Sequence, residues 1–453
     1  MQNKMNHNLI DYIDKQNQYR NLVSFKSNKV NPVHRWFPMV EGFGAEFVRD
    51  IILEQKVSPK VCLDPFSGIG TTALACQDLG IKCFAIENSP FFFDVTRAKL
   101  RADYESHVFD ILISTFDDHL KTCLVELPEM ELESKTFFQG NNLDRWIFDK
   151  PVANAINDIL NHIADFDQNY EIYTALFKVA LGAQLIQVSN VYRNGKCLSY
   201  LKNWQERSIS RNEVHEMFIL YCREVLMMDI RSREMIKPDV HNYINVHRGD
   251  SRVLISSLPN DSVDVVITSP PYLNSRDYTD IYRLELWIMG YVTKFDQERK
   301  LRSSALTSHV QVKLGYLKAP EIDELDRFLS HLEKSKTKLW NKGIPNMIRG
   351  YFFDMESILK DMHPKLKSNA MLYINVSNSA YGRMICEVDT IIAKIAERNG
   401  YEIVEIRIAR YINSSKQQSM RKKLRESVIV LKKLEERGRD CFLLSLENKA
   451  AIA

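Results

Sequence analysis

Short runs of hydrophobic residues recur along the chain, with helical patterns between most of them. Three runs carry the most information because of how they end: Val61–Asp64 and Lys82–Glu87 each finish with an acid, and Val263–Thr268 stops just before a pair of prolines. Continuous apolar runs of this length are typical of strands that are covered on both faces, as in a parallel sheet. We expect further strands at Tyr243–His247, Met371–Val376, Tyr401–Ala409 and Ser427–Leu431.

The connections between these runs predict the fold class. Helical patterns at Thr71–Leu79, Phe352–Met362 and Val388–Arg398 alternate with strands, as in a doubly wound α/β protein. The last two strands have only Tyr411–Glu426 between them, which is polar, basic and loop-like. Such a connection favours an antiparallel final pair. The sequence therefore predicts a doubly wound α/β sheet of seven strands with an antiparallel last strand.

Two connections are far longer than usual loops. Residues 101–240 follow the second strand and show mainly helical patterns, whereas residues 273–350 follow the fourth strand and carry basic clusters. We therefore expect one domain formed by 1–100 and 241–435, interrupted by a helical insertion at 101–240. The amphipathic helices that we expect in the insertion are Val152–Ile163, Glu171–Gln187 and Glu213–Asp229.

Composition and charge change this picture little. The chain has 453 residues, with 61 Lys and Arg against 58 Asp and Glu, and a formal net charge of +3. A near-neutral total says little about nucleic-acid binding, because a basic cleft can lie within it. The cysteines include no CxxC pair, and His34 and His309 are isolated, so we expect neither a disulfide framework nor a metal site. The polar start and the lack of a long apolar run predict a cytoplasmic protein without a membrane span.

The turn after the first strand, Asp64–Thr72, is the first candidate ligand site. Gly68 and Gly70 allow the backbone to turn sharply and approach a ligand, and the helix that follows offers free N–H groups. Glu87 ends the next strand, where an acid can bind ribose hydroxyls. A plain strand–turn–helix and a dinucleotide site, whose GxGxxG/A pattern is also satisfied, are the alternatives. The Asp64 carboxylate would repel a pyrophosphate, but it suits a cationic ligand that carries an ammonium group.

The second candidate, Thr268–Tyr272 with the sequence TSPPY, ends the fourth strand. It should lie beside the glycine turn, because ligands of doubly wound sheets bind at the carboxyl ends of strands. Two prolines stiffen the chain and lack N–H groups, so the carbonyl of Pro270 can point outward as an acceptor. Ser269 adds a hydroxyl and Tyr272 an aromatic face. These groups suit the exocyclic amino nitrogen of a base, held with its lone pair toward a methyl donor. In isolation the motif would be more typical of a proline-rich turn.

On these two motifs the sequence resembles the amino-group DNA methyltransferases of restriction–modification systems. Phe66–Gly70 matches their FxGxG cofactor motif, and Thr268–Tyr272 matches their catalytic (D/N/S)PP(Y/F/W) motif. The likeness extends over roughly 31–100 and 243–433. Weaker matches to other motifs of that family are Val33–Pro38 followed by Glu41–Phe43, Gly249–Asp250, and Leu424–Ser427.

The resemblance implies a Rossmann-like methyltransferase sheet that uses S-adenosyl-L-methionine and acts on a base flipped out of double-stranded DNA. The implied catalytic residues are Ser269, Pro270, Pro271 and Tyr272, and the implied cofactor-binding residues are Trp36, Phe37, Asp64, Phe66, Ser67, Gly68, Gly70, Thr71, Glu87, Asn88 and Asp250.

The target base depends on position 269. SPP forms are typical of the cytosine-N4 branch and DPP forms of the adenine-N6 branch, so Ser269 favours cytosine N4, with adenine N6 as the alternative. Cytosine C5 methylation is disfavoured, because it needs a nucleophilic cysteine, typically in a Pro-Cys pair that this chain lacks. An RNA or protein methyltransferase on the same fold would more often carry Asn at this position. The intact motifs argue against a DNA-binding subunit without activity.

The insertion at 101–240 is the candidate target-recognition region, and 295–345 is a rival or a second DNA-contacting element. Two basic loops could contact phosphates or base edges, although a solvated loop is an equal alternative for each. The resemblance also suggests a cognate restriction endonuclease as partner. The candidate DNA-binding residues of the two loops are Arg193 and Lys196 in Tyr192–Tyr200, and Lys422 and Arg425 in Ser414–Arg425.

Overall fold

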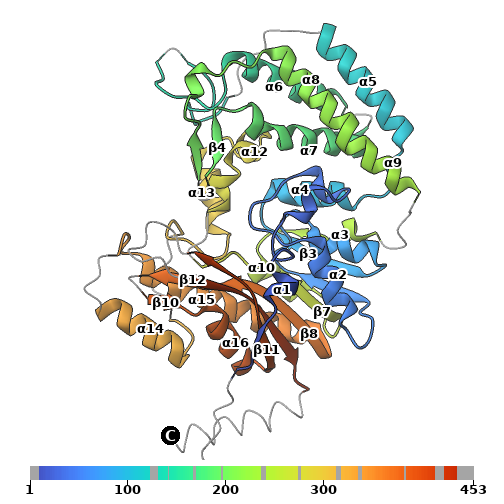
Figure 1. The fold of residues 1–453 in the computed structure, drawn as a ribbon. Coiled ribbons are helices and arrows are strands. Elements are labelled where there is room, and N and C mark those ends of the chain that lie inside the picture. The colour runs from blue at the N-terminus through green and yellow to red at the C-terminus, as the bar shows by residue number, and fades with distance from the viewer. Residues whose placement is uncertain are drawn as a thin grey trace, which may run out of the picture.

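The structure is a computed structural model that describes residues 10–435, apart from 123–130, 141, 167–169, 195–196, 236–240, 274–276, 313–317, 335–338, 382–383 and 414–422. At its centre the described residues form an eight-stranded sheet with helices on both faces, which confirms the predicted α/β class (Figure 1). The seven predicted strands are all present. In spatial order the strands are β1 (Tyr12–Asp14), β11 (Tyr401–Asn413), β12 (Lys423–Lys433), β8 (Leu366–Ser377), β7 (Val263–Thr268), β2 (Val61–Asp64), β3 (Lys82–Glu87) and β6 (Val246–Arg248).

The pairing of the strands divides the sheet into a parallel and an antiparallel part. Strands β8, β7, β2, β3 and β6 are parallel neighbours, whereas β12 runs antiparallel to both β8 and β11. The predicted antiparallel last strand is therefore confirmed. The eighth strand, β1, lies at the edge and pairs in parallel with β11. Its three residues are all exposed, so no hydrophobic alternation marks it in the sequence.

Two predicted boundaries are wrong. Residues Asn242–Asn245 form a 3-10 turn, η5, so β6 begins at Val246 rather than at Tyr243. The polar stretch predicted as a loop between the last two strands is partly sheet, because β11 and β12 extend into it. There Arg410 and Glu426 are paired across the two strands and form an ion pair, which explains why polar residues continue the strands.

Alternate residues of the central strands point into two separate hydrophobic cores. Cys62 and Cys83 face one core, while their neighbours Leu63 and Phe84 face the other. This two-sided burial explains why the strands are continuous apolar runs in the sequence. The first face is covered by α2 (Ala45–Leu53), α3 (Thr71–Asp78) and α4 (Pro90–Leu100), and the second by α10 (Ser251–Leu254), α14 (Asp323–Lys334), α15 (Ile344–Met362) and α16 (Val388–Arg398).

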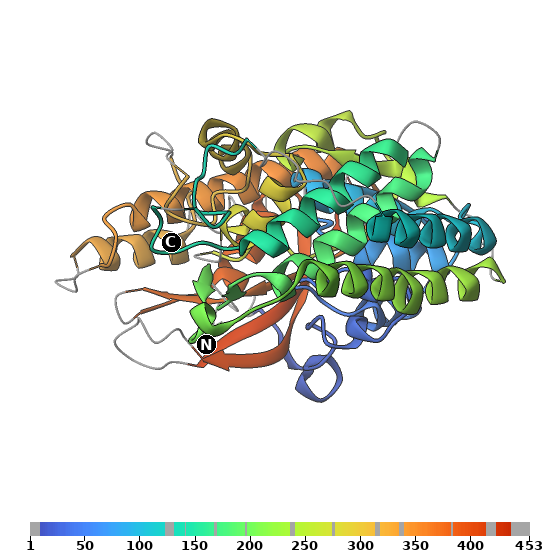
Figure 2. The same ribbon diagram turned by 90° about the horizontal axis from the view of Figure 1, so that it is seen from above.

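The insertion at 101–240 is mainly helical, as predicted, and forms a second lobe beside the sheet (Figures 1 and 2). Its hydrophobic residues belong to the same core cluster as those of α4, so the lobe packs directly on the sheet domain. The predicted helix at Glu213–Asp229 includes a π-helical segment. The elements of the lobe are α5 (Ser106–Thr122), α6 (Lys150–Phe166), α7 (Glu171–Val188), β4 (Val191–Arg193), β5 (Leu198–Tyr200), α8 (Arg211–Tyr221), η4 (Cys222–Met227) and α9 (Met228–Glu234).

The second long connection, 273–350, is shared between the two cores. Its first part, with α12 (Arg283–Ile288) and α13 (Phe295–Ser303), lies beside β4 and adds to the core of the insertion lobe (Figure 1). Its later part, from Leu306 through α14, belongs to the core on the other face of the sheet. Residues 295–345 are therefore not one packing unit, and their contact with DNA stays a prediction.

The remaining described elements are short and connect the larger ones. No described helix is long and apolar enough to cross a membrane. These elements are α1 (Gln16–Tyr19), η1 (Ser27–Lys29), η2 (His34–Trp36), η3 (Trp204–Glu206), η6 (Ile255–Ser257), α11 (Tyr278–Ile281), η7 (His363–Lys365), β9 (Ser379–Tyr381) and β10 (Met384–Cys386).

Candidate active site

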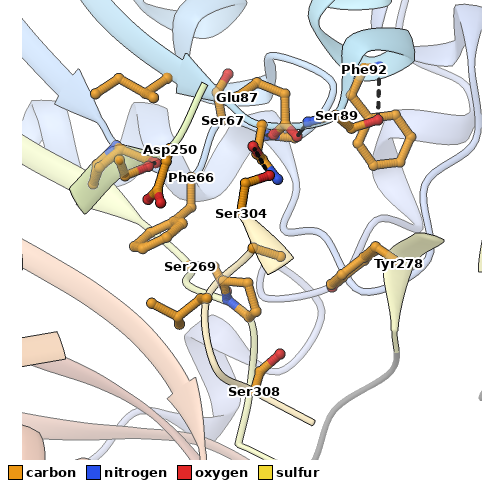
Figure 3. A pocket seen from close by; sticks show the side chains of 18 of the residues that line it. Phe66, Ser67, Glu87, Ser89, Phe92, Asp250, Ser269, Tyr278, Ser304 and Ser308 are labelled. Carbon is orange, nitrogen blue, oxygen red and sulfur yellow. Dashed lines mark hydrogen bonds between the residues drawn. The ribbon is translucent and has the colours of Figure 1, made fainter. Parts of the chain in front are cut away.

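A cavity opens at the carboxyl ends of the parallel strands β2, β3 and β7. Counted out to its open mouth, it holds about 1180 Å³. Residues 64–68 of the glycine turn form one part of its wall, and Ser269 and Pro271 form another (Figure 3). The two motifs found in the sequence, which lie about 200 residues apart, therefore meet in one cavity.

Both glycines of the turn adopt left-handed backbone conformations, but they serve different purposes. Gly68 has φ +55° and lines the cavity, and a Cβ there would lie 2.9 Å from Cε of Met39. Gly70 has φ +81° and caps α3, and its Cβ would lie 2.6 Å from Cγ2 of Thr96. Of the two, only Gly68 is among the cavity-lining residues described here. Gly70 allows close packing of α3 on α4, and its contact with the cofactor stays a prediction.

Asp64 connects the two motifs. Its Oδ1 accepts hydrogen bonds from Oγ1 of Thr268 at 2.6 Å and from the backbone N–H of Phe66 at 3.1 Å. Burial raises the pKa of this carboxyl to about 6. Because Thr268 is the residue before Ser269, this bond ties the start of the glycine turn to the start of the proline motif. A cationic group in the cavity would favour the ionised form of Asp64.

Glu87 shapes the turn from the end of β3. One carboxyl oxygen accepts the N–H of Gly68 at 2.8 Å, and the other accepts the N–H of Ser89 at 2.7 Å. Burial raises the pKa of Glu87 to about 8, although these two N–H groups act in the opposite direction. The side chain also borders the cavity. Glu87 therefore organises the backbone of the turn and also borders the cavity, where its contact with a ribose stays a prediction.

Asp250 begins α10 and carries an arginine partner. It accepts the N–H of Arg252 at 2.9 Å, and the Arg252 guanidinium bonds both of its carboxyl oxygens. The same guanidinium reaches Asp354 at 3.0 Å. Asp250 and Arg252 both line the cavity, on the side of Glu87 and Asn88. The acid predicted to contact the cofactor therefore shares one guanidinium with Asp354.

The wall formed by Ser304–His309 was not indicated by any sequence motif. All of its residues except Thr307 line the cavity. Ser304 donates a hydrogen bond to Oδ1 of Asn88 at 3.0 Å. Thr307 is held by Asp354, which accepts both its N–H at 2.9 Å and its hydroxyl at 2.7 Å. This wall is positioned by the contact of Thr307 with Asp354, which is distant in the sequence, and a single sequence does not reveal such a contact.

Behind the proline motif lies a buried polar network. The hydroxyl of Ser269 donates to the carbonyl of Asn375 at 3.1 Å. The hydroxyl of Tyr272 donates to Glu426 at 2.9 Å and accepts from the Asn375 amide at 2.8 Å. Burial, and then the charge of Glu426, raise the pKa of Tyr272. Pro270 and Tyr272 are not among the described residues that line the cavity. Their contact with the base stays a prediction.

The N-terminal segment reaches the cavity at the second half of its motif rather than at Trp36 and Phe37. Trp36 is 1 % exposed and Phe37 is fully buried. The indole N–H of Trp36 donates to Asp229 at 3.0 Å, and Phe37 packs on aromatic side chains of α4. Both side chains are used in packing and neither is among the described cavity-lining residues, so their contact with the cofactor stays a prediction. The lining residues of this segment are Met39, Glu41, Gly42 and Phe43.

The candidate DNA-binding arginines are paired within the chain. Arg193 forms an ion pair with the fully buried Glu285 and lies 4.7 Å from the ring of Tyr282. Arg425 bonds Asp389 at 3.1 Å, and that aspartate is also fully buried. Each guanidinium thus neutralises a buried acid, so the placement of these arginines does not support the predicted DNA contacts. Lys196 and Lys422 lie outside the described residues.

Within the described part of the chain, two groups of side chains away from the cavity bring metal-ligating atoms within 4.8 Å of one another. In the first, three buried thiols face the core of the first sheet face. In the second, two imidazole rings stack with their centroids 3.7 Å apart. Both arrangements are also compatible with plain packing, and the expectation of no metal stays a prediction. The groups are Cys62, Cys76 and Cys83, and His119, His162 and Asp165.

Comparison with known proteins identifies relatives over most of the chain. A family model described as DNA methylase matches residues 10–98, which include the glycine turn and Glu87. The type II methyltransferase M.AvaI, from Nostoc sp. and from Anabaena variabilis, is 26 % identical over 445 residues, covering 91 % of this chain and 89 % of the relative. The type II methyltransferase M.BsoBI of Geobacillus stearothermophilus is 27 % identical over 462 residues, covering 91 % and 88 %.

The sheet, the shared cavity and these matches define one class. The matches support the assignment of this chain as an amino-group DNA methyltransferase of the restriction–modification type. It is therefore an enzyme, and its general reaction is methyl transfer to DNA.

Proposed function

We propose that this enzyme transfers a methyl group from S-adenosyl-L-methionine to the N4 amino group of cytosine in double-stranded DNA. The observation that carries the proposal is the single cavity bordered by the glycine turn and by Ser269 and Pro271. A donor held at the turn would present its methyl group toward the proline motif. The reaction is then a direct transfer between two ligands held on neighbouring strand ends.

The cavity has the groups that the cofactor requires. The hydroxyl of Ser67 borders it, is buried, and has no hydrogen-bond partner among the described residues, so it is available to a ligand. Asp64 stands where an ammonium group would stabilise its charge. Glu87 and Asp250 supply acceptors for the hydroxyls and the adenine amino group. When bound, the cofactor supplies an electrophilic methyl group on a sulfonium.

The protein residues act on the other reactant. The amino nitrogen of cytosine is a poor nucleophile, because its lone pair is delocalised into the ring. Acceptors on its two hydrogens, Oγ of Ser269 and the carbonyl of Pro270, would favour a pyramidal nitrogen that directs its lone pair at the methyl group. The stiff Pro270–Pro271 backbone keeps these acceptors in place during transfer. Tyr272 would offer its ring to a base that has left the DNA stack.

Serine at position 269 supports cytosine N4 over adenine N6. We also propose that the insertion lobe reads the target sequence and that a cognate restriction endonuclease accompanies the enzyme, as expected for a restriction–modification methyltransferase working in the cytoplasm.

Nucleoside analysis tests the reaction directly. The purified full-length protein is incubated with unmethylated DNA and the labelled cofactor, and the DNA is digested and separated by mass spectrometry. The expected product is N4-methylcytosine, which the Ser269→Ala variant should form far more slowly. N6-methyladenine as the sole product would replace cytosine by adenine in the proposal. Methylation of RNA without methylation of DNA would contradict it altogether.

A further inference from the structure

Tyr272 has a hydroxyl whose single proton can be located by elimination. Its neighbour Glu426 presents a carboxylate oxygen at 2.9 Å, and an ionised carboxylate only accepts hydrogen bonds. Its other close neighbour, the Asn375 amide nitrogen at 2.8 Å, only donates. The Tyr272 proton must therefore lie on the bond to Glu426. It is then unavailable to Ser269, whose Oγ lies 3.5 Å from the Tyr272 hydroxyl.

The proton of Ser269 can be located in the same way. Its Oγ–H has two acceptors within reach, the backbone carbonyl of Asn375 at 3.1 Å and the hydroxyl oxygen of Tyr272 at 3.5 Å. The carbonyl is the closer of the two, and it can only accept. The serine proton is therefore directed into the sheet at β8. What Ser269 presents on the cavity side is oxygen lone pairs, since Ser269 borders the cavity. An aspartate at this position would be an acceptor by its chemistry, whereas a serine becomes one only when its proton is bound elsewhere.

Glu426 is held in place by its surroundings. It is 2 % exposed, and its second carboxylate oxygen accepts the Nε–H of Arg410 at 2.5 Å. Asn375 is 1 % exposed and stands on β8, next to the β12 strand that carries Glu426. Buried charge-assisted bonds of this kind are strong and geometrically specific. Neither Glu426 nor Asn375 is among the described cavity-lining residues, so both act through the motif residues.

We infer that Glu426 and Asn375 are positioning residues that set the proton directions of Tyr272 and Ser269 and so make Ser269 an obligate hydrogen-bond acceptor toward the target amino group. This inference rests on the proposed function, because it assigns a role within the same transfer step. It also explains how serine can replace aspartate in the motif without losing an acceptor.

The inference predicts what happens when the carboxylate becomes an amide. In Glu426→Gln, Arg410 still needs an acceptor, so the amide oxygen faces Arg410 and the amide NH₂ faces Tyr272. The Tyr272 hydroxyl then accepts from two amides, and its own proton turns to Ser269. One of the two lone pairs of Ser269 is then occupied, and the amino group must compete with Tyr272 for this acceptor.

The test is a comparison of four full-length proteins by steady-state kinetics and cofactor binding. Glu426→Gln should lower kcat about 10²-fold, as expected when a reacting group is misplaced, with the KM for DNA and the cofactor Kd little changed. Tyr272→Phe removes the proton in question and keeps the ring, so it should impair kcat less. The double variant Tyr272→Phe, Glu426→Gln should be more active than Glu426→Gln alone.

Asp389→Asn is the matched control. Asp389 is also a fully buried acid paired with an arginine on the same sheet, but its bonds go to Arg425, Ser427 and Thr390 rather than to the proline motif. It should lose stability without a change in kcat. An equal fall in kcat in this control would assign the effect to general destabilisation and overturn the inference.

Three other results would also overturn it: an unchanged kcat in Glu426→Gln, a double variant no more active than Glu426→Gln, or loss of cofactor binding in Glu426→Gln, which would make Glu426 a folding residue. Failure of the proposed function is a separate result, since it would appear in the wild-type protein as the absence of N4-methylcytosine from the nucleoside analysis.

Discussion

The two sides of the active-site cavity are built in different ways. The strand-end side consists of turns that directly follow β2, β3 and β7, and the sheet itself places their residues. The covering side consists of the N-terminal segment and of the Ser304–His309 wall from the second long connection, and individual buried aspartates hold both. Asp229 holds residues 33–36 against the insertion lobe, and Asp354 holds Thr307 in the Ser304–His309 wall. The residues proposed for catalysis lie on the first side, whereas the second side is held by contacts between segments far apart in the sequence.

The largest effect is expected at the anchor of the insertion lobe. Asp229 accepts the N–H of Val33 at 2.7 Å, both Nε and Nη2 of Arg35, and the indole N–H of Trp36. Asp229→Ala leaves these donors without their acceptor and should cost about 3–5 kcal/mol of folding free energy, as for other broken buried pairs. Urea unfolding of the variant and the wild type measures this difference in free energy. A loss as small as that of a surface ion pair would show that the covering side is not held by this residue.

Removing the aromatic ring of Tyr272 should give the second-largest effect. Tyr272→Ala should lower kcat about 10²-fold or more. The cofactor Kd should stay close to that of the wild type, because Tyr272 belongs to the motif after β7 and not to the proposed cofactor-binding residues. Single-turnover methylation and equilibrium binding separate the two quantities. Full activity in this variant would contradict the role of the ring.

Cofactor affinity should depend on pH through the strand-end acids. Burial raises the pKa of Asp64 to about 6 and that of Glu87 to about 8, so both hold protons that a cationic ligand displaces. Affinity should therefore rise with pH through this window, and Glu87→Gln should remove the part near pH 8. Calorimetry in buffers of different ionisation enthalpy counts the protons released, and a pH-independent affinity in the wild type would contradict the assignment.

The raised pKa of Glu87 also makes the folding stability depend on pH, but stability should fall with rising pH whereas cofactor affinity should rise. A carboxyl whose folded pKa is raised stabilises the fold at low pH, below its ordinary value of 4.5, and this contribution is lost as the pH rises through about 8. The protein without ligand should therefore unfold more readily as the pH approaches 8, and Glu87→Gln should weaken that trend.

The smallest effect is expected at the covering wall. Thr307→Val removes the hydroxyl bonded to Asp354 and keeps the backbone N–H bond. The lost hydrogen bond is worth about 1 kcal/mol, so the cofactor Kd should rise about fivefold with kcat unchanged. Isothermal titration measures it. An unchanged Kd would mean that the Ser304–His309 wall is set by its remaining contacts.

The same contrast explains what the sequence could predict. The strand-end side was found from local patterns, because hydrophobic runs, glycines and prolines determine where β2 and β7 end and how the chain turns. The two motifs were rightly expected to share a cavity. Asp64 and Glu87 were also placed at its wall, since the carboxyl ends of parallel strands meet at one edge.

The covering side was largely missed for a physical reason. Its residues are positioned by pairs far apart in the sequence, such as Asp229 with Trp36, Asp354 with Thr307, and Arg193 with Glu285. One sequence contains no signal that joins such pairs. Basic residues such as Arg193 therefore indicated DNA contact, while the structure uses this guanidinium to neutralise a buried acid.

The measurement that tests the central claim most directly is a crystal structure of the full-length enzyme with S-adenosylhomocysteine. The ligand should occupy the cavity at the ends of β2, β3 and β7, with its sulfur on the side of Ser269 and its adenosine toward Glu87 and Asp250. A ligand bound at any other surface, with Ser269 remote from its sulfur, would contradict the account.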